Sequence, residues 1–381
     1  MTGVHDAPSG GHDVAIVGAG AVGLLLACLL AQRGMDVVVL ERRAEPARTS
    51  RAIGIHPPGL AALDAAGVGA AVRAEAIRIR SGVALSGGRL LARLRFDDRP
   101  ILALPQHRTE ALLRARLSTL APGALREGVE VVAIAQSRDG VELSTRGAGG
   151  TTAVRAGWAV GADGIRSPVR QLLGIPMEPH RGMGGYAMAD APDATGAAAT
   201  ALLHLEADGI VESFPMPGGL RRWVARLPAP EPGMTTEALQ RILDERLVEP
   251  PRLPADAPTS AFVARQRLAA RFRLGRIVLV GDAAHEVSPI GGQGMNLGWL
   301  DAVAVDRALA AAAAGDGEAL AGYERARRPA AVRAMRRARW NMAMGAPVSA
   351  RRLALRLALV RALAVEPGRS AVTAAFTMRG L

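Results

Sequence analysis

The sequence predicts an α/β fold in which a parallel-sheet domain is interwoven with an antiparallel-sheet domain and followed by C-terminal helices. Three observations predict it. An apolar strand, a glycine-rich turn and an apolar helix follow one another in residues 13–33. A second buried strand, RIVLV (276–280), leads into another glycine-rich turn far along the chain. Between them, residues 176–270 contain short alternating runs separated by glycine and proline, which is typical of antiparallel strands.

The first strand, turn and helix form the start of a βαβ unit. Gly34 follows the helix as a C-terminal cap, and VVVLE (37–41) predicts a second parallel strand. Further elements are expected, in chain order, as one or two helices within 51–80 with Gly67 as a stop signal, a helix after Pro105, strands at 129–135, 141–145 and 158–160, a helix at 235–247, and mainly helices from Met295 onwards. The most linker-like stretch is EPGMTTE (231–237).

Composition excludes several classes of protein. A chain of 381 residues with 49% hydrophobic residues can bury more than one core, so two domains are expected. No apolar run reaches the roughly 18 uninterrupted residues of a spanning helix, and the first twelve residues lack a signal-peptide pattern, which predicts a cytoplasmic protein. The single cysteine, Cys28, excludes an intrachain disulfide, and no metal-ligand spacing predicts a metal site.

The net charge of +12 does not indicate a nucleic-acid partner. All 47 basic residues are arginine, which is a compositional bias, and 3% aromatic residues are too few for a base-stacking platform. The amphipathic segment RRLALRLALVRALAV (351–365) fits a membrane-surface helix, a subunit contact or a packed C-terminal helix. We prefer the packed helix, so we expect no membrane partner and either a monomer or a homodimer.

The first glycine-rich turn has the pattern G-x-G-x-x-G. Gly18 permits the tight turn, Gly20 lets a pyrophosphate approach the backbone, and Gly23 allows close packing of the helix on the strand. Glu41 ends the second strand, where a carboxylate accepts hydrogen bonds from an adenosine ribose and disfavours a 2′-phosphate. Together with its neighbour Arg42, it predicts a site for FAD or NAD.

Three blocks together resemble the FAD-dependent aromatic-ring hydroxylases, the group A flavoprotein monooxygenases with the para-hydroxybenzoate hydroxylase fold. The first block is the βαβ unit. The second, WAVGADGIRSPVRQLLGI (158–175), is similar to the family's Asp-Gly motif, and the third, VGDAAHEVSPIGGQGMNLGWLDA (280–302), is similar to its Gly-Asp motif. Segments 51–68 and 104–117 also resemble the family.

The resemblance implies a Rossmann-like FAD-binding domain of the GR2/PHBH type and a substrate-binding β-sheet domain. The implied boundaries are 1–75, 98–175 and 271–345 for the discontinuous FAD-binding domain, 76–97 and 176–270 for the substrate-binding domain, and 346–381 for a C-terminal helical segment.

The resemblance also implies that the two distant glycine-rich turns hold one FAD. The first turn would bind the adenosine and pyrophosphate, and the second would bind the ribityl chain and the flavin. The remaining candidates for cofactor binding are Arg51, Arg108, Asp163, Gly164, Asp282, Pro289, Gly292, Gly294, Met295 and Asn296. A helix starting near Gly294 would direct its N-terminus at the flavin, with Asn296 and the Met295 N–H as hydrogen-bonding partners.

The activity implied is hydroxylation of an aromatic substrate, phenolic, polyketide-like or a quinone precursor. NADH or NADPH would reduce FAD transiently, since only one dinucleotide pattern is present, and dioxygen would form a flavin C4a-hydroperoxide. The substrate-activating residues stay unidentified; His204, Tyr186 and Arg222 are candidates, and His285 is expected to be structural. Two alternatives remain, a dehydrogenase or reductase of the same fold, for instance of an isoprenoid double bond, and a flavin-bearing protein that sequesters a ligand.

Overall fold

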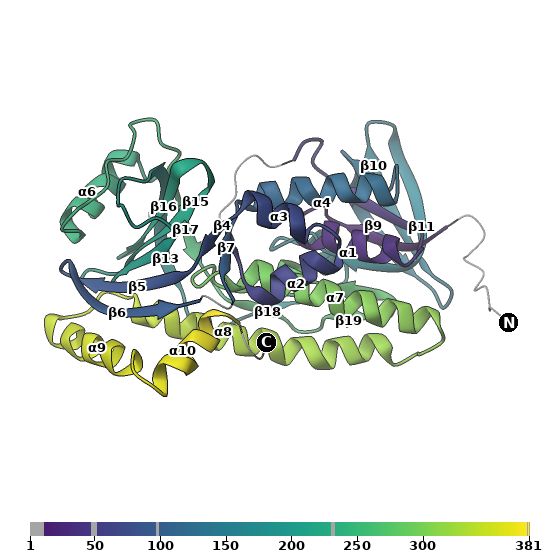
Figure 1. Cartoon of the computed structure of the whole chain (residues 1–381). Coiled ribbons are helices and arrows are strands. Elements are labelled where there is room, and N and C mark those ends of the chain that lie inside the picture. Colours follow the sequence, from purple (N-terminus) through teal and green to yellow (C-terminus); the bar gives the residue numbers. More distant parts are fainter. Residues whose placement is uncertain (1–10, 47–51, 97–98, 230–232, 379, 381) are drawn as a thin grey trace.

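The computed structural model describes residues 11–46, 52–96, 99–229, 233–378 and 380. Two sheet-bearing parts lie side by side along the molecule, and the long helices α7 (Gln293–Ala313) and α8 (Ala319–Met344) run below the larger one (Figure 1). Arg51, part of the segment 231–237 and most of the N-terminal tail lie outside the described residues.

The larger part is built on an eight-stranded sheet. Its strand order is β19-β20-β11-β1-β2-β8, and the hairpin of β9 and β10 extends from β11. The strands are β1 (His12–Val17), β2 (Val37–Glu41), β8 (Leu125–Glu127), β9 (Glu130–Gln136), β10 (Val141–Gly147), β11 (Gly150–Gly161), β19 (Arg273–Leu274) and β20 (Ile277–Leu279). Strands β2, β1, β11 and β20 are parallel, so their carboxyl ends share one edge of the sheet.

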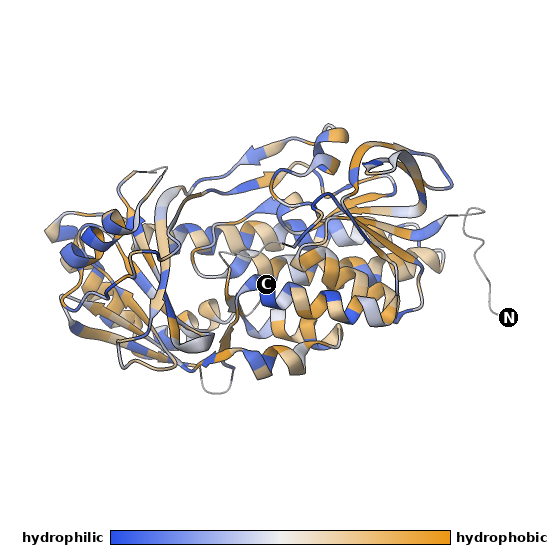
Figure 2. Cartoon of the chain, turned by 90° about the horizontal axis from the view of Figure 1, so that it is seen from above, coloured by the Kyte–Doolittle hydropathy of each residue, from blue (hydrophilic) through white to orange (hydrophobic). Residues whose placement is uncertain are grey.

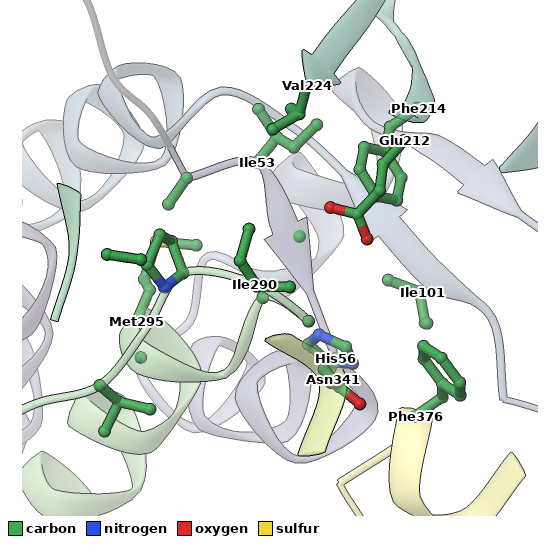
Figure 3. A pocket seen from close by; sticks show the side chains of 18 of the residues that line it. Ile53, His56, Ile101, Glu212, Phe214, Val224, Ile290, Met295, Asn341 and Phe376 are labelled. Carbon is green, nitrogen blue, oxygen red and sulfur yellow. The ribbon is translucent and has the colours of Figure 1, made fainter. Parts of the chain in front are cut away.

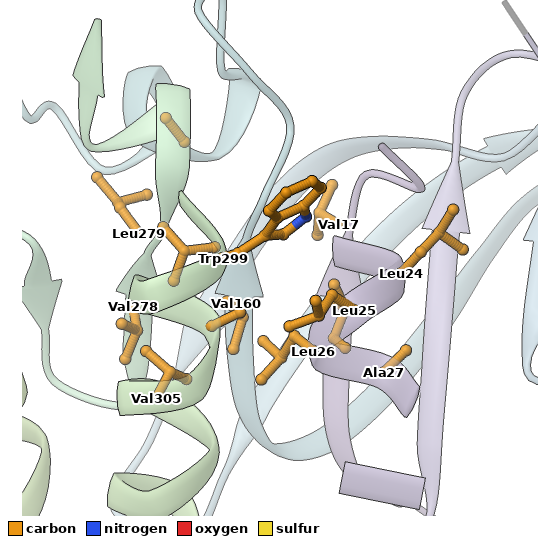
Figure 4. Close-up of a cluster of buried hydrophobic side chains, with 14 of the residues drawn as sticks. Val17, Leu24, Leu25, Leu26, Ala27, Val160, Val278, Leu279, Trp299 and Val305 are labelled. Atoms are coloured by element: carbon orange, nitrogen blue, oxygen red, sulfur yellow. The ribbon is translucent and has the colours of Figure 1, made fainter. Parts of the chain in front are cut away.

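Apolar side chains from distant segments form one core around this sheet. Helix α1 (Ala21–Gln32) packs against α4 (Gln106–Leu120) and α7. Figure 4 shows Leu25 and Leu26 of α1 beside Val160 of β11, with Trp299 of α7 close by. The Trp299 indole N–H donates to the Ala21 carbonyl at 3.0 Å, which ties α7 to the start of α1. Burying each such side chain contributes about 1.5–3 kcal/mol.

The smaller part is a seven-stranded sheet made by two separate chain segments. Its order is β17-β13-β16-β15-β14-β5-β6. The strands are β5 (Ser81–Ser86), β6 (Arg89–Arg95), β13 (Gly184–Pro192), β14 (Thr200–His204), β15 (Val211–Met216), β16 (Leu220–Leu227) and β17 (Ser260–Ala264). Because β5 pairs in parallel with β14, residues 81–95 complete a sheet whose other strands come a hundred residues later. Helix α6 (Thr236–Arg246) covers one face through Leu239 and Leu243.

Short elements join the two sheets. They are β3 (Gly54–Ile55), α2 (Pro57–Ala65), α3 (Gly69–Glu75), β4 (Ile77–Ile79), β7 (Ile101–Ala103), α5 (Pro168–Leu172), β12 (Met177–Pro179), β18 (Arg267–Ala269) and β21 (His285–Glu286), with short 3₁₀ turns η1 (Pro217–Gly219) and η2 (Gly281–Ala283). Figure 2, a view from above coloured by hydropathy, shows hydrophobic and hydrophilic residues mixed along the helices and strands of both parts.

The C-terminal segment is helical, as the sequence predicted. Helices α9 (Ala350–Leu363) and α10 (Gly368–Phe376) pack against β6 and against each other (Figure 1). Within the described ranges, no helix is both long enough and apolar enough to cross a membrane.

Candidate active site

The motif-bearing loops meet at one edge of the parallel sheet. Val17 pairs with Gly161, and Gly161 pairs with Leu279, so β1, β11 and β20 end side by side. The first glycine-rich turn, the Asp-Gly segment and the Gly-Asp segment each follow directly. In α/β sheets of this kind, ligands bind at the carboxyl ends of the strands.

The three glycines of the first turn meet different constraints. Gly18 has φ +105°, and a Cβ there would lie 2.5 Å from the Ala162 carbonyl oxygen. A Cβ on Gly23 would overlap the carbonyl oxygen of Gly18. At Gly20, by contrast, the nearest atom to a Cβ is a Glu110 oxygen at 3.8 Å. Gly18 and Gly23 are therefore required by packing, and Gly20 keeps space open for a ligand.

Glu41 is buried at the end of β2, and both oxygens of its carboxylate accept hydrogen bonds from the protein. One oxygen accepts the Ala19 backbone N–H at 2.8 Å, and the other accepts two N–H groups of Arg43, backbone and side chain, at 3.0 Å. Burial alone would raise the pKa of Glu41, but these hydrogen bonds outweigh it and lower the pKa below its usual range. The carboxylate therefore fixes the turn and stays ionised.

Two connected cavities extend from this edge. The narrow chamber, of about 380 Å³, lies between the first turn, the end of β2 and the Asp-Gly segment. The wide chamber, of about 610 Å³, lies between the two sheets. Residues that line both chambers are Gly20, Gln106, Ala162 and Gly164. The two glycine-rich turns therefore face one continuous space.

The Asp-Gly segment lies at the junction of the chambers. Asp163 lines the narrow chamber; one carboxylate oxygen accepts the Val169 N–H at 2.9 Å, and the other is buried without a partner in the described residues. Burial raises the pKa of Asp163. Arg170 is buried and donates to the carbonyls of Ala283 and Ile165, which ties this segment to the Gly-Asp segment.

Asp282 faces the wide chamber. The described part of the chain offers its carboxylate no hydrogen bond, and its surroundings raise its pKa, mainly through desolvation. A buried clamp holds the backbone beside it: Asp301 accepts the Gly281 N–H at 3.2 Å and also binds His285 and Arg327. The structural role predicted for His285 agrees with this geometry.

The start of α7 borders the wide chamber through backbone. Gly292, at φ +67°, precedes the helix, and Pro289, Gly292, Gly294 and Met295 all line the wide chamber. Asn296 differs from the expectation. Its side-chain oxygen accepts the His56 N–H, and its amide donates to the carbonyls of Gly54 and Gly292, so the side chain is buried and does not line the chamber. The Asn296 side chain therefore holds the loop in place.

Arg108 also differs from the expectation. The helix α4 begins at Gln106, so Gln106 and Glu110 share one helix face and Arg108 points away. Arg108 pairs with Glu75 at 3.0 Å and is half exposed, whereas Gln106 and Glu110 both line the narrow chamber. The Glu110 carboxylate accepts the first free N–H of α1, from Ala21, at 3.1 Å. The sequence analysis missed that Gln106 and Glu110 are four residues apart in this helix, which places both side chains on one face.

Side chains alternate between the two faces of the antiparallel sheet, and this decides which of the candidate residues face the wide chamber. His204 faces away from the wide chamber toward Trp223, and Tyr186 is buried against Phe262 beyond its edge. Arg222 does line it, bound to Asp190 at 2.7 and 2.8 Å. A residue that sequence analysis missed, Glu212, faces the same space (Figure 3). The remaining predicted site residue, Arg42, lines the narrow chamber.

This geometry defines a dinucleotide-binding α/β protein with a second, apolar chamber next to its nucleotide site. The comparisons identify its kind. The model of the FAD binding domain family matches residues 11–338. The chain is 37% identical over 352 residues to a 12-dehydrotetracycline 5-monooxygenase/anhydrotetracycline 6-monooxygenase of Streptomyces rimosus, covering 86% of this chain and 69% of the relative.

Solved structures agree. p-Nitrophenol 4-monooxygenase PnpA of Pseudomonas putida has a TM-score of 0.87 at 26% identity, covering 97% of this chain and 99% of that one. The anhydrotetracycline hydroxylase OxyS of Streptomyces rimosus has a TM-score of 0.79 at 33% identity, covering 97% and 76%. The chain belongs to the FAD binding domain family and is an FAD-dependent monooxygenase.

The residues present fit FAD. Gly20 leaves open space beside the N-terminus of α1, where a pyrophosphate finds backbone N–H groups. The carboxylate of Asp282 and an oxygen of Asp163 are free to accept hydrogen bonds from ribityl hydroxyls or a nicotinamide. Glycine backbone at 291–294 allows a flat ring system to approach closely.

Proposed function

We propose that this chain hydroxylates a neutral phenolic substrate of fused-ring, polyketide-like size, using NADH or NADPH and dioxygen. The observation that carries the proposal is the wide chamber, which continues directly from the nucleotide site and is walled almost entirely by apolar side chains. Pockets of this volume hold small organic ligands, and a few polar groups in an apolar wall fix their orientation.

FAD, when bound, would supply the redox chemistry of a hydroxylation that consumes NAD(P)H and dioxygen. The protein residues position and polarise it. The turn at Gly18–Gly23 and the ordered Glu41 hold the adenosine end, and Asp282 accepts hydrogen bonds from the ribityl chain. The backbone N–H groups at the start of α7 stabilise negative charge on the adjacent ring.

The C-terminal helices close the wide chamber. Val360 and Leu363 of α9, with Val372 and Phe376 of α10, contribute apolar side chains to its wall. Figure 3 shows Phe376 opposite Ile290 and Met295. An apolar wall on this side excludes water, and this protects a reactive oxygen-bearing cofactor from side reactions.

Two of the similar proteins are named for anhydrotetracycline, which has fused rings, and for p-nitrophenol, which has a single ring. These two compounds set the range of substrate size that we consider. The charge of the wall favours the first type. Of the ionisable residues in the sheet wall, Arg222 is held by Asp190, and Glu212 is anionic when ionised. Such a wall repels carboxylates and phenolates and accepts neutral hydroxylated rings.

The test is a screen of the purified yellow protein for NAD(P)H oxidation with anhydrotetracycline, p-nitrophenol and 1-naphthol, under ¹⁸O₂. We expect stimulated oxidation and a product that gains one ¹⁸O atom, most strongly with anhydrotetracycline. Turnover without oxygen incorporation, sustained by an artificial electron acceptor, would favour a dehydrogenase or reductase. Flavin spectral shifts without any stimulated oxidation would favour ligand sequestration. Protein that retains no FAD would contradict all three.

A further inference from the structure

Glu212 is a polar side chain with apolar neighbours in the sheet wall of the wide chamber. It lies on β15, where Glu212 and Phe214 face the wide chamber, while Val211 packs under α6 on the other face of the sheet. Its cross-strand neighbours are Leu203 on β14 and Val224 on β16, which also line the chamber. Figure 3 shows the carboxylate pointing into the space across from Ile290 and Met295.

This carboxylate has no partner in the described protein. The Glu212 side chain is 7% exposed, and no hydrogen bond or ion pair to it occurs among the described residues. A buried carboxylate without donors costs several kcal/mol when ionised. Desolvation is the sole cause that raises the pKa of Glu212, to about 7. The group is therefore balanced between its two protonation states at neutral pH.

The charged and titratable groups facing it do not compensate. Arg222, from β16, is bound to Asp190 of β13. Tyr186, also on β13, is a buried phenol whose pKa is raised by burial and, to a smaller extent, by the charge of Glu212.

Further polar groups line the chamber on other elements, namely His56, Gln106, Arg265, Asp282, Glu286 and Asn341. His56, preceding α2, is neutral because burial lowers its pKa to about 4. The polar group from α8 is Asn341, which is uncharged (Figure 3). Among the described residues none of these groups donates a hydrogen bond to Glu212, so the carboxylate is open to a donor from a bound ligand.

We propose that Glu212 is a catalytic residue that accepts the hydrogen bond of the substrate's phenolic hydroxyl and takes its proton as the ring attacks an electrophilic oxygen. The O–H bond breaks, its electron pair stays on the phenolic oxygen and moves into the ring, and the proton passes to a Glu212 carboxylate oxygen. A more electron-rich ring attacks an electrophilic oxygen faster. The proposal rests on the proposed function and specifies its substrate as a phenol bound in the neutral form.

The first test measures binding, independently of turnover. Flavin absorbance titrations of the FAD-loaded protein compare 1-naphthol with 1-methoxynaphthalene, which lacks the transferable proton. Because a hydrogen bond to a charged group is worth about 1.5–3 kcal/mol, wild type should prefer 1-naphthol by about 10–100-fold. Glu212→Gln should reduce that preference to about 2–10-fold, because its amide oxygen accepts only a neutral hydrogen bond. Glu245→Gln, the same change on the exposed surface of α6, should keep it.

The second test measures turnover of anhydrotetracycline, or of the best phenol in the screen, against pH. Loss of a general base costs about 10²–10⁴-fold, so kcat of Glu212→Gln should fall by that factor while KM changes by about tenfold or less. Wild-type kcat should rise with pH through a value near 7, and this limb should vanish in Glu212→Gln and return, at a lower rate, in Glu212→Asp.

The outcomes separate the two proposals. Phenol-stimulated oxygen insertion with unchanged kcat, pH profile and naphthol preference in Glu212→Gln would overturn the role of Glu212 and leave the hydroxylase intact. Absence of oxygen insertion in wild type would overturn the hydroxylase, and the naphthol preference would still decide whether Glu212 binds a phenol.

Discussion

Glu41 lies beside the narrow chamber and Glu212 beside the wide chamber. Both carboxylates are buried, but their surroundings shift the two pKa values in opposite directions. Glu41 accepts three N–H groups, and these hydrogen bonds lower its pKa in spite of burial. Glu212 has no donor in the described residues, and desolvation raises its pKa to about 7. A carboxylate satisfied by the protein organises backbone, whereas an unsatisfied one is available to a ligand. The comparison separates residues that build the cavity from residues that react within it.

We expect the largest effect from adding a side chain at Gly18 or Gly23 of the first turn, where the new Cβ would overlap backbone atoms. Gly23→Ala would overlap the Gly18 carbonyl, and Gly18→Ala would clash with Ala162 at an unfavourable φ. Overpacking costs about 1–3 kcal/mol, and a clash with backbone belongs at the upper end of that range. We expect loss of FAD and a strongly lowered Tm, measured by flavin absorbance and calorimetry.

Gly20→Ala is the matched control for those two variants. A Cβ there meets no atom closer than 3.8 Å, so the Tm of the FAD-free protein should stay near that of wild type. FAD affinity should still fall because the methyl group enters the ligand space. Equal loss of stability in all three variants would contradict the distinction between packing and ligand glycines.

Asp282→Ala should weaken FAD binding by about 10–100-fold, since it removes a charged acceptor worth about 1.5–3 kcal/mol. Fluorescence titration of the FAD-free protein measures this change. Asp301→Asn provides the comparison, because it loosens the clamp on Gly281 instead of removing a ligand group. It should lower Tm as well as affinity, and a purely structural Asp282 would behave in the same way as Asp301.

The two glutamates should affect stability at opposite ends of the pH range. A lowered pKa, as for Glu41, contributes stability above the unfolded pKa that is lost as pH falls through the folded pKa. A raised pKa, as for Glu212, contributes stability at low pH that is lost as pH rises through about 7. Glu212→Gln should therefore exceed wild type in unfolding free energy by about 1–3 kcal/mol at pH 8 and match it at pH 5. Chemical denaturation at both pH values checks this; equal curves would show that Glu212 is solvated.

Arg108→Ala should have the smallest effect. Its ion pair with Glu75 is largely exposed, and such pairs contribute about 0–1 kcal/mol. FAD affinity should be unchanged within about twofold, whereas Gln106→Ala, on the cavity-facing side of the same helix, should weaken it. A tenfold loss in Arg108→Ala would restore the contact that sequence analysis expected.

Sequence patterns predicted the glycines that the first turn requires because those requirements are local. A tight turn after a strand demands glycines at fixed spacing, so Gly18 and Gly23 can be recognised without a structure. Asn296 and Arg108 were assigned to the ligand, but each has a partner from a distant segment, Gly54 or Glu75, that no local pattern shows. The residue at which a helix begins, and the register of a strand, decide which of two nearby side chains faces the cavity.

The substrate wall was harder to predict for the same reason. Its strands come from two segments about a hundred residues apart, and alternation alone does not reveal which face meets the other sheet. His204 on β14 and Glu212 on β15 are each a polar residue in a mainly apolar strand, but only Glu212 faces the wide chamber. The signal is a lone acid between apolar positions on one strand face, Ile210 and Phe214, once that face is known.

A crystal structure of the FAD-loaded protein soaked with 1-naphthol tests the central claim most directly. We predict one FAD per chain, with its adenosine near Glu41 and its flavin beside Met295, and the naphthol hydroxyl within hydrogen-bonding distance of Glu212. FAD confined to one chamber, or a naphthol whose hydroxyl points away from Glu212 toward Asn341, would contradict the account.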